Sequence, residues 1–499
     1  MAPQSVSWRV HGRRVLACAI LPVTLAIPVP PVQAQPVGLP RLGDTASMRL
    51  SPRTEEVLGA AIMADGRRDP DYIDDPAVSQ YLTEMGRRLS MHVTGAPQVN
   101  VFAIRAPSIN AFAMPGGHIG VHSGLVVAAG SEAELAGVLA HEIAHVAQRH
   151  VARGIMAQEQ SSAMMLGVML AAIAAAAAGA GSLAQGAAMF GQAAAINSQL
   201  SFSRDAEREA DRIGLQTMHA AGYDPDGMAR MFSRLAQTAR FNESTAASYA
   251  STHPLSIERL SDLQNRIRQV GRKASADSDT FWFVRARLRV AQGGYDRSSD
   301  PLAALRAEAT ESSGVRKAAA LYGVAMALQR RGDLEGARRA LQEAQRLGHE
   351  HPMLAHLAVE LAMAEKQWQE AVKLSADAVR AWPRDRALAL IHARALQRAG
   401  DDRGAAEFLA KAIEQWPEAE PELYRLAAES RARLGDGVAS ARLMADYFVL
   451  IGALPAAIGQ LQQARVLSRD FYEQSVFDAR IRELQRRQED ERAILAQFR

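Results

Sequence analysis

The sequence contains almost no cysteine and few aromatic residues. Of its 499 residues, one is cysteine (Cys18) and 5% are aromatic. Cys18 lies within an apolar stretch near the N-terminus that has the features of a cleavable signal. Without that stretch the chain has no cysteine, which excludes disulfide bonds. The abundance of Ala instead favours closely packed helices.

The first 34 residues have the charge pattern of a secretory signal peptide. Three arginines precede the apolar segment Val15–Ile27, and a small-residue cleavage site, Val32–Ala34, follows it. We therefore expect residues 1–34 to be removed and the mature chain to lie in a bacterial periplasm; an uncleaved anchor and a lipid on Cys18 are the alternatives. Removing the three arginines lowers the net charge from +3 to 0, so the composition does not support a nucleic-acid partner.

Charged residues are also absent from a long internal segment. No Asp, Glu, Lys or Arg occurs between Gln160 and Ser203, and residues 163–181 are mostly Ala, Met and Leu. The length is sufficient to span a membrane, but Ala is weakly hydrophobic and glycines interrupt the run. A single span would also separate the two halves of the metal site described below. We therefore expect a helical hairpin over residues 160–203, either buried or in peripheral contact with a membrane, close to the active site, where it can act as a lid.

The strongest functional signal is the motif HEIAH, which comprises His141, Glu142 and His145. Ser131, with Glu134 three residues later, predicts the start of a helix, and no proline interrupts the segment. In a helix, residues i and i+4 differ by about 40° and about 6 Å, so the two histidines share one face. They can bind one zinc ion, next to which Glu142 can accept a proton from water. A helix with two hydrogen-bonded histidines and no metal is the alternative.

A third metal ligand is expected on a downstream helix that begins near Ser203. Glu207 and Asp211 are four residues apart and therefore share one face of this helix. We assign Glu207 as the third ligand, whereas Asp211 either accepts a hydrogen bond from a ligand histidine or donates a proton to the leaving amine. A solvated charged helix face is the alternative. His150 falls one residue short of the last histidine in HExxHxxGxxH, which disfavours that ligand arrangement.

Two further residues are weaker candidates for the site. His253 lies in the loop Ser251–Pro254, which the proline biases away from helix. It can approach the metal as a fourth ligand in a resting state, hydrogen-bond a developing oxyanion, or lie on the surface. Arg259, on the next predicted helix, is a candidate of the same kind. We interpret His118 and His122 as polar strand residues.

Short strands are predicted before the metal helix, over residues 99–105, 109–113 and 118–122. A strand that precedes a zinc helix can present its edge to an extended substrate; an ordinary sheet edge is the alternative. After a linker over residues 35–50, we expect a mostly helical, zincin-like metallopeptidase domain with a small β-sheet over residues 51–272.

A helical repeat follows the predicted peptidase domain. Ala303, Ala337, Ala371, Ala405 and Ala439 are spaced 34 residues apart. This is the period of the tetratricopeptide repeat, in which two helices approach closely at a small residue. We therefore expect an α-solenoid of tetratricopeptide repeats over residues 280–499, which offers a surface for peptides or partner proteins.

The segments HEIAH and SRDAEREADRIG, together with NAFAMPGG, GYDP and STHP, resemble the gluzincin-type metallopeptidase family of the CaaX prenyl proteases and their soluble bacterial relatives. The resemblance implies an endopeptidase with one zinc ion per chain, the ligands His141, His145 and Glu207, the general base Glu142 and the proton donor Asp211. It also implies that the histidine of STHP can close the metal site.

For periplasmic members that carry repeats, the resemblance further implies hydrolysis of misfolded or stalled outer-membrane proteins. The repeats would then bind these clients or the outer-membrane β-barrel assembly machinery. Two alternatives remain: a chaperone or binding protein with a largely closed metal site, and a membrane-embedded protease.

Overall fold

The computed structural model describes residues 50–96, 98–157, 204–241, 249, 252–271, 273–293, 300–417 and 420–496. All of them belong to one compact unit, Ala46–Arg499. The predicted signal peptide (residues 1–34), the linker (35–50, except Leu50) and the uncharged hairpin (160–203) lie outside the described residues. Over the described ranges, no helix has both the length and the hydropathy needed to cross a membrane.

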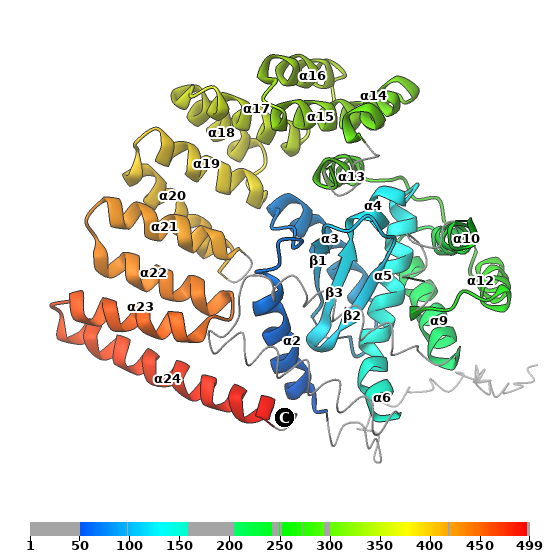
Figure 1. The fold of residues 1–499 in the computed structure, drawn as a ribbon, viewed down its shortest axis with the longest axis horizontal. Helices are drawn as coiled ribbons and strands as arrows, with labels where there is room; N and C mark the ends of the chain where they lie inside the picture. Colours follow the sequence, from blue (N-terminus) through cyan, green and yellow to red (C-terminus); the bar gives the residue numbers. More distant parts are fainter. Residues whose placement is uncertain are drawn as a thin grey trace, which may run out of the picture. The chain divides into compact units, whose positions relative to one another are not determined.

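The described residues are mostly helical and contain a small β-sheet, which confirms the predicted fold class (Figure 1). The sheet has the strand order β1-β3-β2. Its strands are β1 (Asn100–Ile104), β2 (Ala111–Met114) and β3 (His118–His122). β3 pairs in parallel with β1 and antiparallel with β2. The tight turn η1 (Pro115–Gly117) joins β2 to β3, and Gly116 within it has a φ of 77°, which glycine adopts without strain.

The position of β3 corrects one expectation. The strand closest to the metal helix in sequence is the central strand of the sheet, so its backbone is paired on both sides and cannot accept a substrate. The reason is the connectivity, because the short turn folds β2 back onto one side of β3 while β1 pairs on the other. β1 and β2 are the edge strands, and β2 packs against the metal helix.

The peptidase region consists of helices arranged around this sheet. They are α2 (Pro52–Gly66), α3 (Pro76–Ser90), α4 (Ser123–Ala128), α5 (Glu132–Ala147), α6 (His150–Ala157), α9 (Arg204–Ala220), α10 (Asp226–Phe241) and α12 (Ile257–Val270). The predicted metal helix is α5, which begins at Ser131, whose Oγ accepts the Glu134 N–H at 3.3 Å. α5 packs against α3, β2, α9 and α10, and most of its side chains are buried.

Small residues bring the neighbouring helices close to α5. A Cβ at Gly214 of α9 would lie 3.1 Å from the backbone nitrogen of His141, and a Cβ at Gly137 of α5 would lie 2.7 Å from the Cα of Met228 in α10. A larger residue at either position would push the helices apart. Gly214 therefore lets α9 present its side chains to the histidines of α5, and Gly137 lets α10 pack closely against the same helix.

The remaining helices form a solenoid over the region where the repeats were predicted. They are α13 (Asp279–Ala291), α14 (Pro301–Glu311), α15 (Gly314–Arg330), α16 (Leu334–Arg346), α17 (Pro352–Ala364), α18 (Trp368–Ala381), α19 (Arg386–Arg398), α20 (Asp402–Gln415), α21 (Pro421–Arg433), α22 (Gly437–Leu450), α23 (Leu454–Leu467) and α24 (Phe471–Ala496). Consecutive helices from α15 to α24 pack against each other.

The alanines of the 34-residue period differ in burial between the middle and the ends of the array. Ala337, Ala371 and Ala405 are completely buried, as expected at a close helix contact. Ala303 is exposed and Ala439 is half-buried. The close approach of paired helices at this position is therefore a property of the central repeats.

The repeats contact the peptidase region at both ends of the array. A continuous buried apolar cluster runs from α3 and the sheet through α13 and α15 to α17, and Arg287 Nε in α13 donates to Asp75 Oδ2 at 2.5 Å. At the other end, Leu495 of α24 packs against the apolar cluster of α2, next to which α24 lies in Figure 1. Arg67 also donates to the carbonyl of Leu450 at 3.3 Å.

Candidate metal centre

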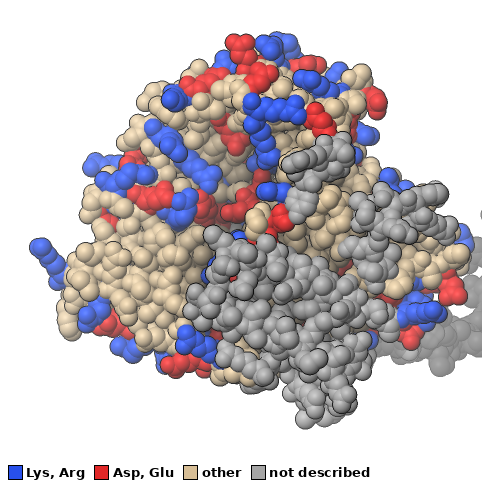
Figure 2. Space-filling model, viewed as in Figure 1, with Lys and Arg blue, Asp and Glu red and all other residues tan. Residues whose placement is uncertain are grey.

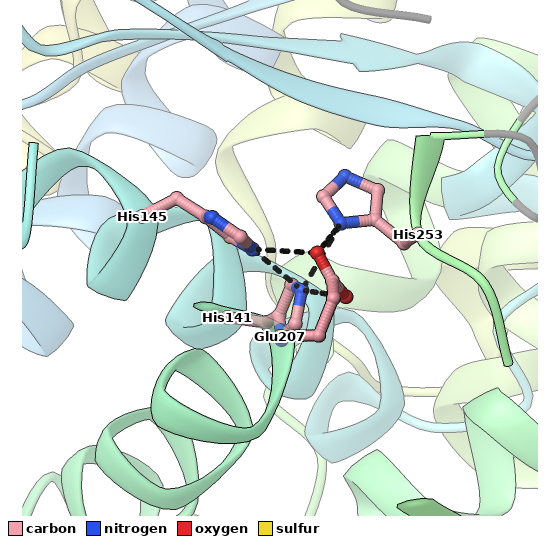
Figure 3. A group of neighbouring side chains, drawn as sticks. All are labelled: His141, His145, Glu207 and His253. Carbon is pink, nitrogen blue, oxygen red and sulfur yellow. Dashed lines mark hydrogen bonds and ion pairs between the residues drawn. The ribbon is translucent and has the colours of Figure 1, made fainter. Parts of the chain in front are cut away.

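Four buried side chains converge beside α5: His141 and His145 from α5, Glu207 from α9, and His253 from the segment before α12 (Figure 3). Each offers one nitrogen or oxygen atom, and these atoms lie within 4.8 Å of one another. All four side chains are at most 1% exposed. The structure therefore brings together both histidines of HEIAH, the acidic residue 62 positions after His145, and the loop histidine.

The distances within the cluster match the size of a metal ion. Nε2 of His141 lies 3.0 Å from Nε2 of His145, which is 3.4 Å from Oε1 of Glu207. Nδ1 of His253 lies 3.0 Å from the same oxygen and 3.3 Å from His141 Nε2. Four ligands placed tetrahedrally at about 2.0–2.1 Å from zinc are separated by roughly 3.3–3.4 Å. The residues present thus fit zinc in both ligand chemistry and spacing.

Glu142 lies next to this cluster and is completely buried. Its Oε1 is 3.5 Å from Nε2 of His253. Burial raises the pKa of the Glu142 carboxyl above its usual value, although the neighbouring histidines and the backbone of Ala113 in β2 favour the charged form. A buried carboxyl with a raised pKa beside the ligands has the properties of a general base.

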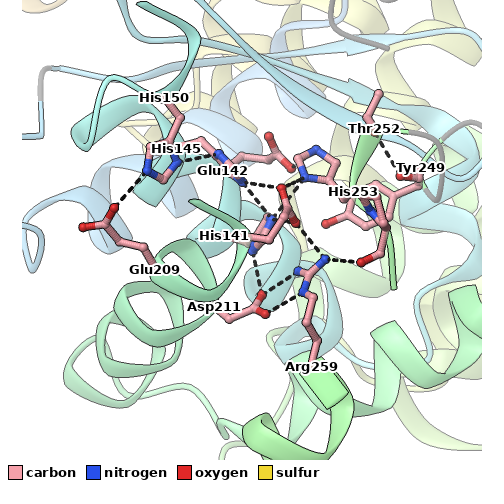
Figure 4. Close-up of polar contacts among 12 residues, drawn as sticks. His141, Glu142, His145, His150, Glu209, Asp211, Tyr249, Thr252, His253 and Arg259 are labelled. Atoms are coloured by element: carbon pink, nitrogen blue, oxygen red, sulfur yellow. Dashed lines mark hydrogen bonds and ion pairs between the residues drawn. The ribbon is translucent and has the colours of Figure 1, made fainter. Parts of the chain in front are cut away.

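Asp211 lies behind His141, on the side opposite its ligand nitrogen (Figure 4). Oδ1 of Asp211 is 3.0 Å from His141 Nδ1. Burial would raise the pKa of Asp211, but hydrogen bonds from Arg259 and His141 hold it below its usual value. Asp211 is therefore a charged hydrogen-bond acceptor, which favours the first of the two roles considered for it from the sequence.

Arg259 connects two carboxylates of the site. Its Nε and Nη2 donate to the two oxygens of Asp211, each at 2.8 Å, and its Nη1 lies 2.7 Å from Oε2 of Glu207. Nη1 also donates to the carbonyl of Pro254 at 2.8 Å, which connects the arginine to the segment that carries His253. The sequence indicated Arg259 only weakly, because nothing in its local pattern reveals that it faces α9.

Two more residues extend the polar network of the cluster, although the sequence did not predict this role for them. His150 contacts His145, and Glu209 contacts His150. From the sequence, His150 was considered only as a metal ligand, and its spacing argued against that. By contrast, His118 and His122 lie in β3 and outside the cluster, as expected; His122 Nδ1 is 2.7 Å from Ser108 Oγ.

Comparison with known proteins identifies the family. Residues 76–267 match Peptidase family M48, and this range includes every residue of the cluster. The Beta-barrel assembly-enhancing protease of Yersinia pestis is 30% identical over 456 residues, which cover 90% of this chain and 92% of that protein. The protein of the same name from Escherichia coli (strain K12) is 29% identical over 485 residues, 96% of this chain and 97% of that protein.

A third relative matches more closely over a shorter region. The Putative beta-barrel assembly-enhancing protease of Vibrio cholerae is 38% identical over 293 residues, which cover 57% of this chain and 58% of that protein. The similarity to the first two relatives extends over nearly the whole of each chain. This chain therefore belongs to Peptidase family M48 and is a metallopeptidase.

Proposed function

We propose that this protein is a zinc-dependent endopeptidase of the periplasm that hydrolyses misfolded or stalled outer-membrane proteins. The observation that carries this proposal is the buried cluster of His141, His145 and Glu207, whose donor atoms have the separations expected around one zinc ion. We assign the peptidase domain to residues 51–272 and the tetratricopeptide repeats to residues 280–499.

In this proposal the three ligands hold the ion and Glu142 moves the proton. When bound, zinc acts as a Lewis acid that polarises the substrate carbonyl and makes water more acidic. Glu142 accepts the proton of the attacking water. Asp211 accepts the Nδ1–H of His141, which keeps that ring oriented and leaves Nε2 as its ligand atom.

His253 is assigned as the fourth ligand of a resting state. Its Nδ1 lies among the donor atoms of the other three ligands, where the substrate carbonyl and water must be placed for hydrolysis. The segment that carries His253 has to move before a peptide can react, so we expect the resting enzyme to have low activity. The contact between Arg259 and Pro254 connects this segment to the rest of the site.

The substrate class is inferred from the relatives and from the sheet. Two relatives that match nearly the whole chain are named for their role in enhancing beta-barrel assembly, and the signal-like residues 1–34 support a periplasmic location. An extended client chain that pairs with the edge strand β2 would pass beside Glu142, because Ala113 of β2 lies next to that carboxyl. The repeats would bind the client or the assembly machinery.

Substitution of Glu142 by Gln tests the catalytic role. The variant should retain zinc, measured by elemental analysis, because Glu142 is not a ligand. Its rate of cleavage of casein or an unfolded outer-membrane protein should fall by about 10²–10⁴-fold. Glu84→Gln, an exposed change on α3, serves as the control and should cleave at the wild-type rate. Wild-type cleavage by Glu142→Gln would show that the assignment is wrong.

A second candidate function is supported by the fact that the protein itself supplies four donor atoms. In this alternative the protein is a chaperone or binding protein whose metal site is largely closed. All four donor atoms come from the protein and all are buried. His253→Ala distinguishes the two functions, because it opens the fourth position. A rise in proteolysis supports an enzyme that is closed at rest. Unchanged, negligible proteolysis together with client capture by Glu142→Gln supports the chaperone.

A further inference from the structure

His150 reaches the metal ligand His145 because the helix is interrupted between them. In a continuous α-helix, a residue five positions further on is rotated by about 140° and points elsewhere. Here α5 ends at Ala147 and α6 begins at His150. Arg149, in the break, has a φ of 53°, a left-handed conformation that is uncommon for residues other than glycine.

Contacts with the start of the chain's first described helix hold Arg149 in this conformation. Its Nε donates to Oε1 of Glu55 in α2 at 2.8 Å, and its Nη2 donates to the backbone carbonyl of Leu50. A strained backbone persists only where its surroundings hold it, and such positions are enriched at functional sites. The left-handed conformation of Arg149 changes the direction of the chain, and His150 therefore points back toward His145.

When His150 is neutral, its two hydrogen bonds have only one consistent direction. Its Nε2 is 3.1 Å from Oε2 of Glu209, and its Nδ1 is 2.8 Å from Nδ1 of His145 (Figure 4). An ionised carboxylate can only accept, so the Nε2–H of His150 donates to Glu209. The Nδ1 of a neutral His150 then accepts the Nδ1–H of His145.

This arrangement determines which nitrogen of His145 is available as a ligand. With its proton on Nδ1, the ring presents an unprotonated Nε2, and Nε2 is the atom that faces Glu207 at 3.4 Å. A ligand histidine commonly depends on such a partner at its other nitrogen, which sets both its tautomer and its orientation.

We propose that His150 and Glu209 are positioning residues that hold His145 in its Nδ1–H tautomer, with Nε2 directed at the metal. The two ligand histidines of α5 are thus supported differently. Asp211 contacts His141 directly, whereas Glu209 acts on His145 through the imidazole of His150. Glu207, Glu209 and Asp211 all lie on α9, so one helix supplies a ligand and the carboxylates that support both histidines.

The proposal rests on the zinc site of the proposed function, and its test is metal binding by the full-length protein. Zinc affinity is measured by competition with a chromophoric chelator. His150→Ala removes the acceptor for His145, and we expect its zinc affinity to fall by about 10–100-fold. Glu209→Ala should lower the affinity less. Because the Glu209 side chain is 33% exposed, this variant also remains informative if His150→Ala does not fold.

A conservative variant separates positioning from a merely structural role. In His150→Asn, the side-chain oxygen lies near the position of the histidine Nδ1 and can accept the same proton. We therefore expect most of the affinity to return in His150→Asn but not in His150→Gln, whose amide group is one carbon further from the backbone. Circular dichroism establishes that each variant compared is folded.

The outcomes separate this proposal from the function on which it rests. If the wild-type protein binds no zinc, both are overturned. If the wild type binds zinc and a folded His150→Ala binds it equally tightly, only the positioning role is overturned. Equal loss of affinity in folded Asn and Ala variants would overturn the tautomer assignment.

Discussion

The metal centre buries polar and charged side chains, whereas the repeats bury mainly apolar ones. Around α5 the buried side chains include imidazoles, carboxylates and the guanidinium of Arg259, which is 5% exposed. In the central repeats most buried contacts are apolar, and the buried residues of the cluster around Ala405 are all alanine or leucine. Charged side chains of the repeats lie mostly at the surface, and on the face shown in Figure 2 basic and acidic groups are intermingled.

The difference shows which property of a residue matters in each region. A charge removed from water requires a partner, so deleting one member of a buried ionic network leaves another member uncompensated. A close-packed helix contact instead requires a particular volume. Chemical identity should therefore dominate at the metal centre and side-chain size in the repeats, which three substitutions test in order of decreasing effect.

Removal of Arg259 should have the largest effect on stability. Arg259→Met leaves the buried carboxylates of Glu207 and Asp211 without their cation, and breaking a buried pair costs about 3–5 kcal/mol. The measurement is hydrogen exchange of α9 and α12 in the intact protein, which reports the local free energy of opening. The loss should be larger after the metal is removed with a chelator, because zinc would otherwise neutralise Glu207.

The matched control is Arg266→Met on the same helix. Arg266 pairs with Asp262, but both side chains are more than one third exposed, so the change should be below about 1 kcal/mol. Equal effects of the two substitutions would contradict the claim that burial makes Arg259 indispensable.

Enlargement of a buried alanine should have an intermediate effect. Ala405→Leu inserts a larger side chain at a completely buried position of α20, and overpacking of this kind costs about 1–3 kcal/mol. Exchange of α20 and α21 should accelerate, while zinc affinity stays unchanged. Ala410→Leu, on the exposed side of the same helix, is the control. If zinc affinity falls in Ala405→Leu, the two regions are more strongly coupled than their contacts suggest.

Loss of an exposed ion pair in the repeats should have the smallest effect. Arg380 and Asp377 on α18 are paired, but their side chains are 79% and 54% exposed. We expect Arg380→Ala to change the opening free energy of α18 by less than about 0.5 kcal/mol, since water solvates both groups well. A loss comparable to that of Arg259→Met would break the contrast between the two regions.

The parts of the molecule that were predictable have local or periodic signatures. HEIAH places two ligands on one helix face by its spacing alone, and the 34-residue period places helix pairs without knowledge of their packing. Glu207 was found because its motif follows a recognised half-site. Arg259, His150 and Glu209 lack such a signature, because their importance comes from contacts with other helices.

Helix α5 shows most clearly which features the sequence determined and which depend on the tertiary structure. The sequence alone determined that a helix begins at Ser131 and carries His141 and His145 on one face, because helical periodicity and capping are local properties. Only the tertiary structure decided which groups stand behind those histidines, that β3 is the central strand, and that His253 completes the cluster. These features depend on how distant segments pack and on a break at Arg149, which contacts with α2 hold in place.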